Sequence, residues 1–134
     1  MNAHLLAGIL AGMQGGQAEP PVDHQIMVIG SRLRTWRGHV VRPRQGPLRC
    51  VTDRSTTDVE VDRIGCDALV TCMTPLRPRL DLMRDRTLDR TTRISMRDAI
   101  QRDLNTCVTQ RRAELIEELV DRRYRAREAG RDDN

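Results

Sequence analysis

Four cysteines constrain the fold of this 134-residue chain more than any other feature. The chain has no Phe, one Trp and one Tyr, so a hydrophobic core must be built almost entirely from aliphatic side chains. A small domain with such a core usually needs cross-links or a metal ion for stability. The cysteines include no C-x-x-C pair and have no His at zinc-finger spacing, which argues against zinc. Their even number therefore predicts two disulfides.

The predicted helices narrow the choice among the three ways of pairing Cys50, Cys66, Cys72 and Cys107. Apolar residues at steps of three and four predict a helix that contains both Cys66 and Cys72. Six residues on a helix place the two Cα atoms about 9 Å apart along the axis and about 120° apart around it, too far for a bond. Cys72 and Cys107 each lie on an apolar helix stripe. We therefore predict the pairs Cys72–Cys107 and Cys50–Cys66.

The first eighteen residues contain no charged side chain. Residues 5–13 form a nine-residue apolar block, and Gly16-Gln17-Ala18 follows with small residues where a signal peptidase cleaves. This pattern predicts a signal peptide at 1–18, a Pro-containing linker at 19–25, and a periplasmic or secreted protein. The leader lacks the usual Lys or Arg, so an apolar N-terminus or a short buried helix is the alternative.

The next part of the chain has strand-like segments. Residues 26–30 are apolar and rich in β-branched side chains, and residues 34–42 and 48–52 read as two further strands around a turn with Pro43, Gly46 and Pro47. These segments predict a small antiparallel sheet or hairpin, although residues 31–36 fit a helical turn equally well. Trp36 is expected to plug the small core, with stacking on a ring or glycan as the alternative.

The second half of the chain reads as helical. Residues 55–58 supply cap-forming oxygens for a helix over 58–73, which Thr74-Pro75 ends, and Pro78 lies near the start of another. After a break at 90–94, Ser95 starts a helix of about 32 residues, or about 48 Å, that reaches about residue 127. The expected fold is mainly α (α+β). A small N-terminal β-hairpin or sheet packs on a disulfide-linked helical hairpin with a long C-terminal helix. Residues 26–129 form one domain, and 130–134 form a frayed tail.

The long helix carries two candidate binding features. Arg111 and Arg112 interrupt its apolar stripe, which then resumes. We expect the resumed stripe to be a seam buried against another protein or a second copy of this chain, because so long a helix outruns a small domain. The alternative is a break near Arg111 that folds the helix back on a monomer. The seam comprises Leu115, Ile116, Leu119, Val120 and Tyr124.

Arginine supplies all 23 basic side chains, and the net charge is +4 with a pI of about 9.4. A net positive charge favours anionic partners. The densest cluster, a candidate contact for an anionic surface, comprises Arg122, Arg123, Arg125 and Arg127. Acidic neighbours surround this cluster, so a solvated helix end is the alternative. Nucleic acid is the expected partner only if the protein stays in the cytoplasm, as an Arg-rich helical binding protein.

No set of residues in the sequence predicts catalysis, a cofactor or a metal. The Gly12–Gly16 segment does not follow a strand, so it is not a phosphate-binding loop. Asp81, Asp85 and Asp89 share a helix face but are flanked by arginines. The three His are scattered, and no Ser has the G-x-S-x-G context of a nucleophile. We therefore expect a protein that is not an enzyme and has no transmembrane segment.

Four segments carry a resemblance: IMVIGSRL (26–33), WRG (36–38), RCVT (49–52) and DRIGC (62–66). Together they resemble uncharacterised small cysteine-containing periplasmic proteins of high-GC Gram-negative bacteria. The resemblance covers roughly residues 26–72 and implies an exported location, with no known activity. The sequence thus favours an exported, non-catalytic interaction or structural module.

Overall fold

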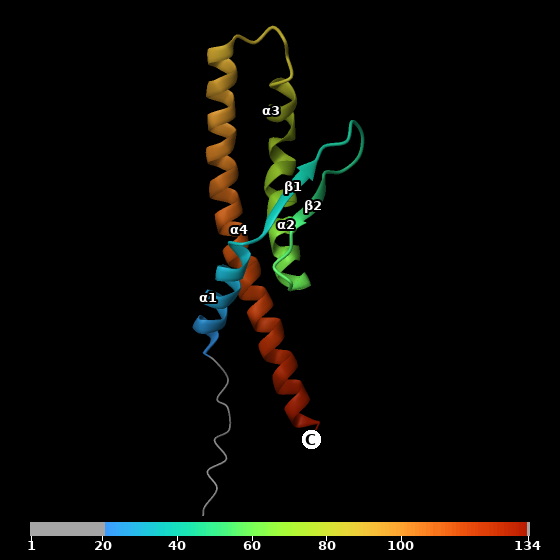
Figure 1. Cartoon of the computed structure of the whole chain (residues 1–134), viewed down its shortest axis with the longest axis vertical. Helices are drawn as coiled ribbons and strands as arrows, with labels where there is room; N and C mark the ends of the chain where they lie inside the picture. The colour runs from blue at the N-terminus through green and yellow to red at the C-terminus, as the bar shows by residue number, and fades with distance from the viewer. Residues whose placement is uncertain (1–20, 134) are drawn as a thin grey trace, which may run out of the picture.

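The computed structural model describes residues 21–133, and the predicted leader therefore lies outside the described residues. Helices account for 70% of the structure, which confirms the predicted mainly α (α+β) fold class. The elements, in chain order, are α1 (Val22–Leu33), β1 (Arg37–Val41), β2 (Arg49–Arg54), α2 (Val59–Met73), the 3-10 turn η1 (Thr74–Leu76), α3 (Arg77–Leu82) and α4 (Arg90–Asp132) (Figure 1).

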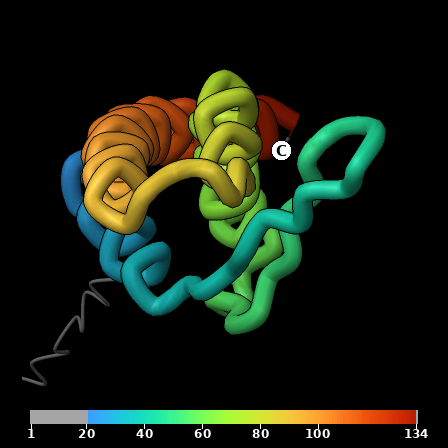
Figure 2. The backbone as a smooth tube through the Cα atoms, turned by 90° about the horizontal axis from the view of Figure 1, so that it is seen from above, coloured from blue at the N-terminus to red at the C-terminus, as the bar shows by residue number. Residues whose placement is uncertain are grey.

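Two long rods form the frame of the molecule. The first consists of α2, η1 and α3 in succession, and the second is α4, whose 43 residues span about 64 Å. Helix α1 and the β1–β2 hairpin both lie on one side of this pair of rods (Figure 2). Beyond α1, the end of α2, η1, α3 and the first half of α4 extend together as an arm, which we define as residues 69–112 (Figure 1). The hairpin rises beside this arm, and Arg77 of α3 donates to the carbonyl oxygens of Pro43 and Gly46 in the hairpin turn.

The core lies below the arm, where α1, α2 and α4 meet. It is mainly aliphatic, as the composition requires, and Trp36 is its aromatic member, with only 4% of its surface exposed. The Trp36 Nε1–H donates to Thr52 Oγ1 over 3.2 Å, which satisfies its polar atom. The prediction that Trp36 plugs the core is confirmed. The other core residues are Ile29, Leu33, Val61, Ile64, Ala68, Leu115, Ile116, Leu119 and Val120.

Both predicted disulfides are present. Cys50–Cys66 joins β2 to α2 with the Cα atoms 5.5 Å apart, and Cys72–Cys107 joins α2 to α4 at 5.8 Å. The described part of the chain has no free cysteine. Each disulfide therefore joins a different element to α2, because Cys66 and Cys72 lie on different faces of that helix.

The first apolar segment is a helix and not a strand. The prediction of a strand at residues 26–30 and of a linker reaching residue 25 is wrong, because α1 begins at Val22. The β-branched content suggested a strand, but Gln25, Ile29 and Leu33 are buried at steps of four, which is the helical period. The hairpin expected from the later segments is confirmed as β1 paired with β2 in an antiparallel manner.

The long helix starts earlier and ends later than expected. The break predicted at 90–94 is wrong, because the Asp89 carboxylate accepts the Thr92 backbone N–H at 2.9 Å and starts α4 at Arg90. Residues 130–132, predicted as frayed, are also helical. The predicted cap of α2 is confirmed at Asp58, and Pro78 lies in the first turn of α3 as expected.

Candidate interaction surface

The predicted partner seam on α4 is part of the chain's own core. Leu119 and Val120 are 0% and 1% exposed, and Leu115 and Ile116 are also buried. The prediction that these side chains await a partner is wrong, because α1 is a helix that packs on this half of α4. Tyr124 lies at the edge of the core and is 38% exposed.

Two of the four predicted anion-contact arginines already pair with acidic side chains. The Arg123 guanidinium lies 2.9 Å from the Asp58 carboxylate, and Arg122 lies 3.4 Å from Glu60. Asp58 is also 3.6 Å from Arg32 of α1, so one carboxylate links three helices. Arg123 is therefore half-buried against an acid of the chain itself, whereas 63% of the Arg122 side chain stays exposed, and the anion contact remains a prediction. The other two, Arg125 and Arg127, are exposed.

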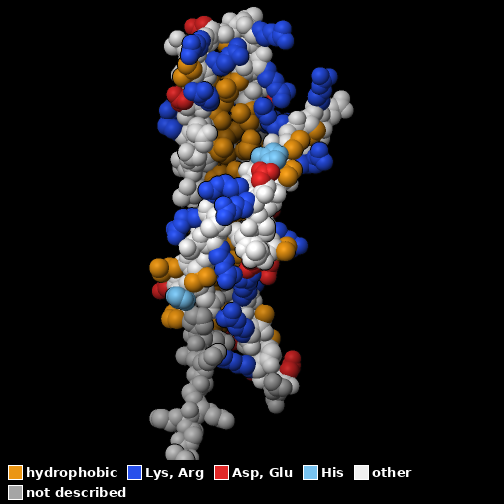
Figure 3. Space-filling view, viewed as in Figure 1, with side chains coloured by type: hydrophobic (Ala, Val, Ile, Leu, Met, Phe, Trp, Pro, Cys, Tyr) orange, Lys and Arg blue, Asp and Glu red, His pale blue; other side chains and the backbone are white. Residues whose placement is uncertain are grey.

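A different apolar surface remains partly open on the arm. Its side chains are half-buried, and they lie beside three residues of the arm that are buried, Cys72, Leu76 and Ile100. They recur at steps of three and four, which places them along facing sides of the two rods. Figure 3 shows apolar side chains gathered between the rods of the arm, with arginines along the edges. We call this surface the apolar strip; it comprises Leu69, Met73, Leu80, Leu104 and Val108.

The strip continues the core but lacks its third helix. On α4, Leu104, Val108, Arg112 and Ile116 follow one another at steps of four, so they form one row along the helix. Ile116 is in the core beside α1, whereas Leu104 is half-buried. Among residues 21–133, no further helix covers the arm where the row leaves the core (Figure 1).

Arg112 and Arg37 mark the lower end of the strip. The Arg112 guanidinium carbon lies 5.7 Å from the centre of the Trp36 ring, a cation–π contact. Burial lowers the pKa of Arg112, and the positive charge of nearby Arg37 adds to this effect. Arg37 begins β1 and is exposed. Neither arginine forms an ion pair with an acidic side chain of residues 21–133.

Charge is segregated along the molecule. Residues 34–52 contain five Arg and no acidic residue, and the arm contains ten Arg and five Asp. These two segments together carry a net charge of +10, whereas the whole chain carries +4. The rest of the chain is therefore net acidic. The surface around the apolar strip is the basic end of the molecule.

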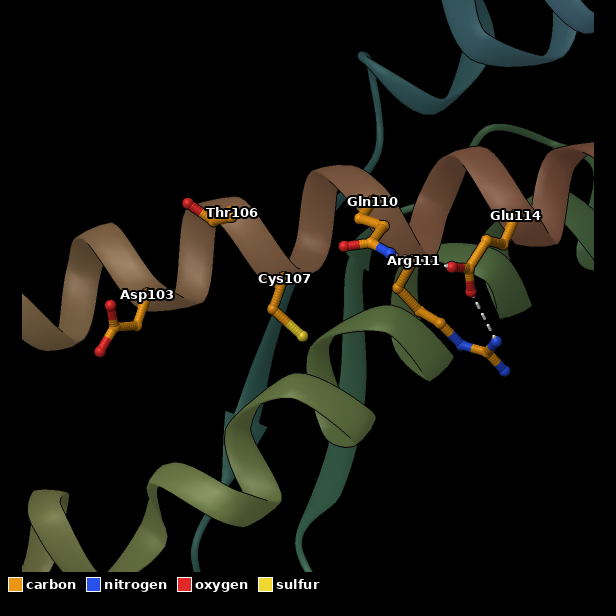
Figure 4. A pocket seen from close by; sticks show the side chains of 6 residues that line it. All are labelled: Asp103, Thr106, Cys107, Gln110, Arg111 and Glu114. Carbon is orange, nitrogen blue, oxygen red and sulfur yellow. Dashed lines mark hydrogen bonds and ion pairs between the residues drawn. The ribbon is translucent and has the colours of Figure 1, made fainter.

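A shallow pocket lies on α4 beside the Cys72–Cys107 disulfide (Figure 4). Its charged groups are already paired: Arg111 lies 3.1 Å from Glu114, and Asp103 lies 2.6 Å from Arg79. Gln110 Nε2 also donates to Glu114 at 3.3 Å. The pocket thus offers no free charged group to a ligand and no catalytic set.

Residues 21–133 hold no group of three or more His, Cys, Asp or Glu side chains arranged to bind a metal ion. None of the helices in this range is both long and apolar enough to cross a membrane. Comparisons with protein-family models, with curated proteins and with solved structures found no match for this chain.

The apolar strip could have been found in the sequence only in part. The spacing of Ile100, Leu104 and Val108 predicts an apolar helix face, but spacing does not tell which part of that face the chain itself will cover. That depends on where α1 packs, and α1 was expected to be a strand. The pairing of Arg122 and Arg123 joins residues more than sixty positions apart, which no local pattern reveals.

Proposed function

We propose that this protein is an exported, non-catalytic interaction module that binds an acidic amphipathic helix of another protein on the apolar strip. The observation that carries the proposal is the open arm. In the lower half of the molecule, α1 packs against both α2 and α4 and completes a three-helix core. In the arm, two helices present half-buried apolar side chains with no third helix among the described residues. A partner helix would complete the same arrangement.

The charge around the strip supports an acidic partner. The arm and residues 34–52 together carry a net charge of +10, and arginines lie along the edges of the apolar side chains in Figure 3. Complementary charge speeds association and excludes partners of the wrong sign. The same argument disfavours a second copy of this chain docked arm to arm, because two basic surfaces would repel each other.

The disulfides support the exported location. All four cysteines are paired, and such bonds persist mainly in oxidising compartments such as the periplasm or the cell exterior. Their positions also support a binding role, because Cys72–Cys107 crosses the arm near the strip. This bond holds the two rods together where few side chains are fully buried. A preformed, cross-linked surface loses little conformational entropy when a partner binds.

Calorimetric titration with model helices tests the proposal. The probe is a helical peptide of about 20 residues with Leu on one face and Glu on the other, which matches the arm in length. The control peptide has Lys in place of each Glu. We expect the acidic peptide to bind, and the basic peptide to bind at least tenfold more weakly. Leu104→Gln should weaken binding of the acidic peptide at least tenfold. Met27→Gln, at an exposed site on α1, should not change this binding.

Other occupants of the apolar strip predict different results for the unaltered protein and the Leu104→Gln variant. Binding of a DNA duplex that is tighter than peptide binding and insensitive to Leu104→Gln would favour the nucleic-acid alternative. Sedimentation of the protein alone as a dimer that Leu104→Gln dissociates would assign the strip to a second copy. Equal binding of the acidic and basic peptides would contradict the proposal.

A further inference from the structure

We infer that Arg37 and Arg112 form a carboxylate-binding site at the lower end of the apolar strip, next to the buried Trp36. The inference rests on the proposed function, because the carboxylate would come from an acidic side chain of the docked helix. It adds a defined anchor point to that function. The site is built from the first residue of β1 and from the middle of α4, so it exists only in the folded chain.

Arg112 is half-buried and has no acidic partner among residues 21–133. Arg123, which is also half-buried, lies 2.9 Å from the Asp58 carboxylate. Arg112 contacts an aromatic ring instead, and its Nε–H is buried without a hydrogen-bond acceptor. A buried N–H without an acceptor is costly, and a charged acceptor supplied from outside would remove that cost.

Arg37 is held in place by the backbone. Its Nη1 donates to the carbonyl oxygens of Arg34 and Trp36, each over 2.8 Å. These two bonds fix the guanidinium beside Trp36 and leave its other N–H groups available. Arginine presents its donors as a planar fork that matches the two oxygens of a carboxylate, so a fixed Arg37 is suited to bidentate binding.

The two arginines also repel each other. Arg37 donates to the Trp36 carbonyl and the Arg112 guanidinium lies over the Trp36 ring, so both positive charges lie at one residue. The charge of Arg37 accordingly adds to the effect of burial in lowering the pKa of Arg112. Two like charges with no counter-charge are destabilising, and a bound anion between them stabilises both. The apolar end of the strip at Val108 favours a carboxylate on an otherwise apolar helix face over a freely hydrated ion.

Fluorescence of the folded protein reads this site directly, because Trp36 is the only tryptophan in the chain. The probe is N-acetyl-glutamate amide, which carries one carboxylate, and the matched control is the neutral N-acetyl-glutamine amide. We expect saturable change of Trp36 emission with the glutamate compound and none with the glutamine compound. Arg112→Gln and Arg37→Gln should each weaken binding at least tenfold. Arg102→Gln, an exposed arginine of the same helix, should leave it unchanged.

The outcomes separate this inference from the proposed function. Loss of glutamate response in Arg37→Gln, whose side chain is exposed and outside the core, supports the site even if Arg112→Gln disturbs folding. No response in the unaltered protein, or an equal response in both arginine variants, overturns the carboxylate site. Leu104→Gln should not alter the small-molecule response. If Leu104→Gln abolishes helix binding but the glutamate compound never binds, the proposed function is supported and the carboxylate-binding site is rejected.

Discussion

The indole ring of Trp36 lies directly on the backbone of α2 at Gly65. A Cβ atom added to Gly65 would lie 2.5 Å from Trp36 Cδ2, closer than real side chains approach. The absence of a side chain at this position lets the ring reach the helix and close the core. Cys66, the next residue, holds β2 to the same helix through its disulfide. Tryptophan, glycine and disulfide thus fasten the hairpin to α2.

Gly65→Ala should therefore destabilise the protein. The new methyl group must displace a buried ring or bend a helix, and overpacking of this kind costs about 1–3 kcal/mol. This loss exceeds the gain of up to about 1 kcal/mol that Ala gives over Gly in a helix. Denaturant unfolding followed by Trp36 fluorescence measures the change.

Gly130→Ala is the matched control. Gly130 is also in a helix, but an added Cβ meets nothing within 4 Å. We expect an unchanged or slightly raised free energy of unfolding. A loss at Gly130 as large as that at Gly65 would mean that the ring contact is not the cause.

The cross-links were the part of the fold that the sequence predicted best. Cys66 and Cys72 lie on one helix at a spacing that no disulfide spans, which excludes one of the three pairings. The apolar stripes that carry Cys72 and Cys107 then favoured the pairing that the structure has. The prediction of a strand at 26–30 failed because a run of five residues fits a strand or a helix equally well. The burial of Gln25, Ile29 and Leu33 at steps of four is what identifies the helix.

The binding surface was less accessible to sequence reasoning for the same reason. The prediction of a seam at Leu115 and Leu119 identified a real apolar face, but it allowed the N-terminal region to cover only part of that face. Because α1 is a helix, it covers the C-terminal half of α4 at Leu115 and Leu119, and the apolar surface that stays partly open is on the arm around Leu104. Which half is covered depends on tertiary packing between distant segments, and periodicity carries no information about it.

Asp58 should make stability depend on pH in the acidic range. Burial by itself raises the pKa of Asp58, but the hydrogen bond from Arg123 and the backbone N–H of Val61, together with the Arg123 charge, lower it below the ordinary value. The stabilisation is therefore fully present above the unfolded pKa of about 3.9 and is lost as the pH falls through the lower folded pKa. Unfolding measured between neutral pH and strong acid should show this loss.

Asp58→Asn removes the charge but keeps an oxygen that can cap α2. We expect a loss of about 1 kcal/mol at neutral pH, and the difference from the unaltered protein should shrink as the pH falls below about 4. Asp121→Asn, an exposed site on α4, serves as the control and should leave the profile unchanged. A difference that stays constant down to strong acid would rule out the carboxylate as its source.

Cys107→Ser should loosen the arm more than the core. The bond closes a loop with a sequence separation of 35, and its loss destabilises the folded state by roughly 4 kcal/mol in the chain-entropy description. The arm has few fully buried residues, so hydrogen exchange should rise most at residues 90–104. Residues 115–120 should stay more protected, because Cys50–Cys66 and the core remain. An equal rise in both segments would show that the arm has no separate dependence on this bond.

The mass of the protein isolated from its native host tests export. We expect the loss of residues 1–18 and a further deficit of four hydrogen atoms from two disulfides. Mass spectrometry before and after reduction and alkylation separates the two contributions. A full-length mass with four free thiols would instead support the cytoplasmic alternative.

Leucine truncation should separate the covered half of α4 from the open half. Leu119 is 0% exposed, so Leu119→Ala should cost about 3 kcal/mol through lost burial and a cavity. Leu104 is half-buried and lies on the apolar strip, so Leu104→Ala should cost about 1 kcal/mol or less, because water already reaches the site. Yet Leu104→Ala should weaken binding of the acidic helix, whereas its small stability cost leaves the fold intact. Equal losses of stability at the two positions would mean that the arm is as covered as the core, and the strip would then have no surface left for a partner.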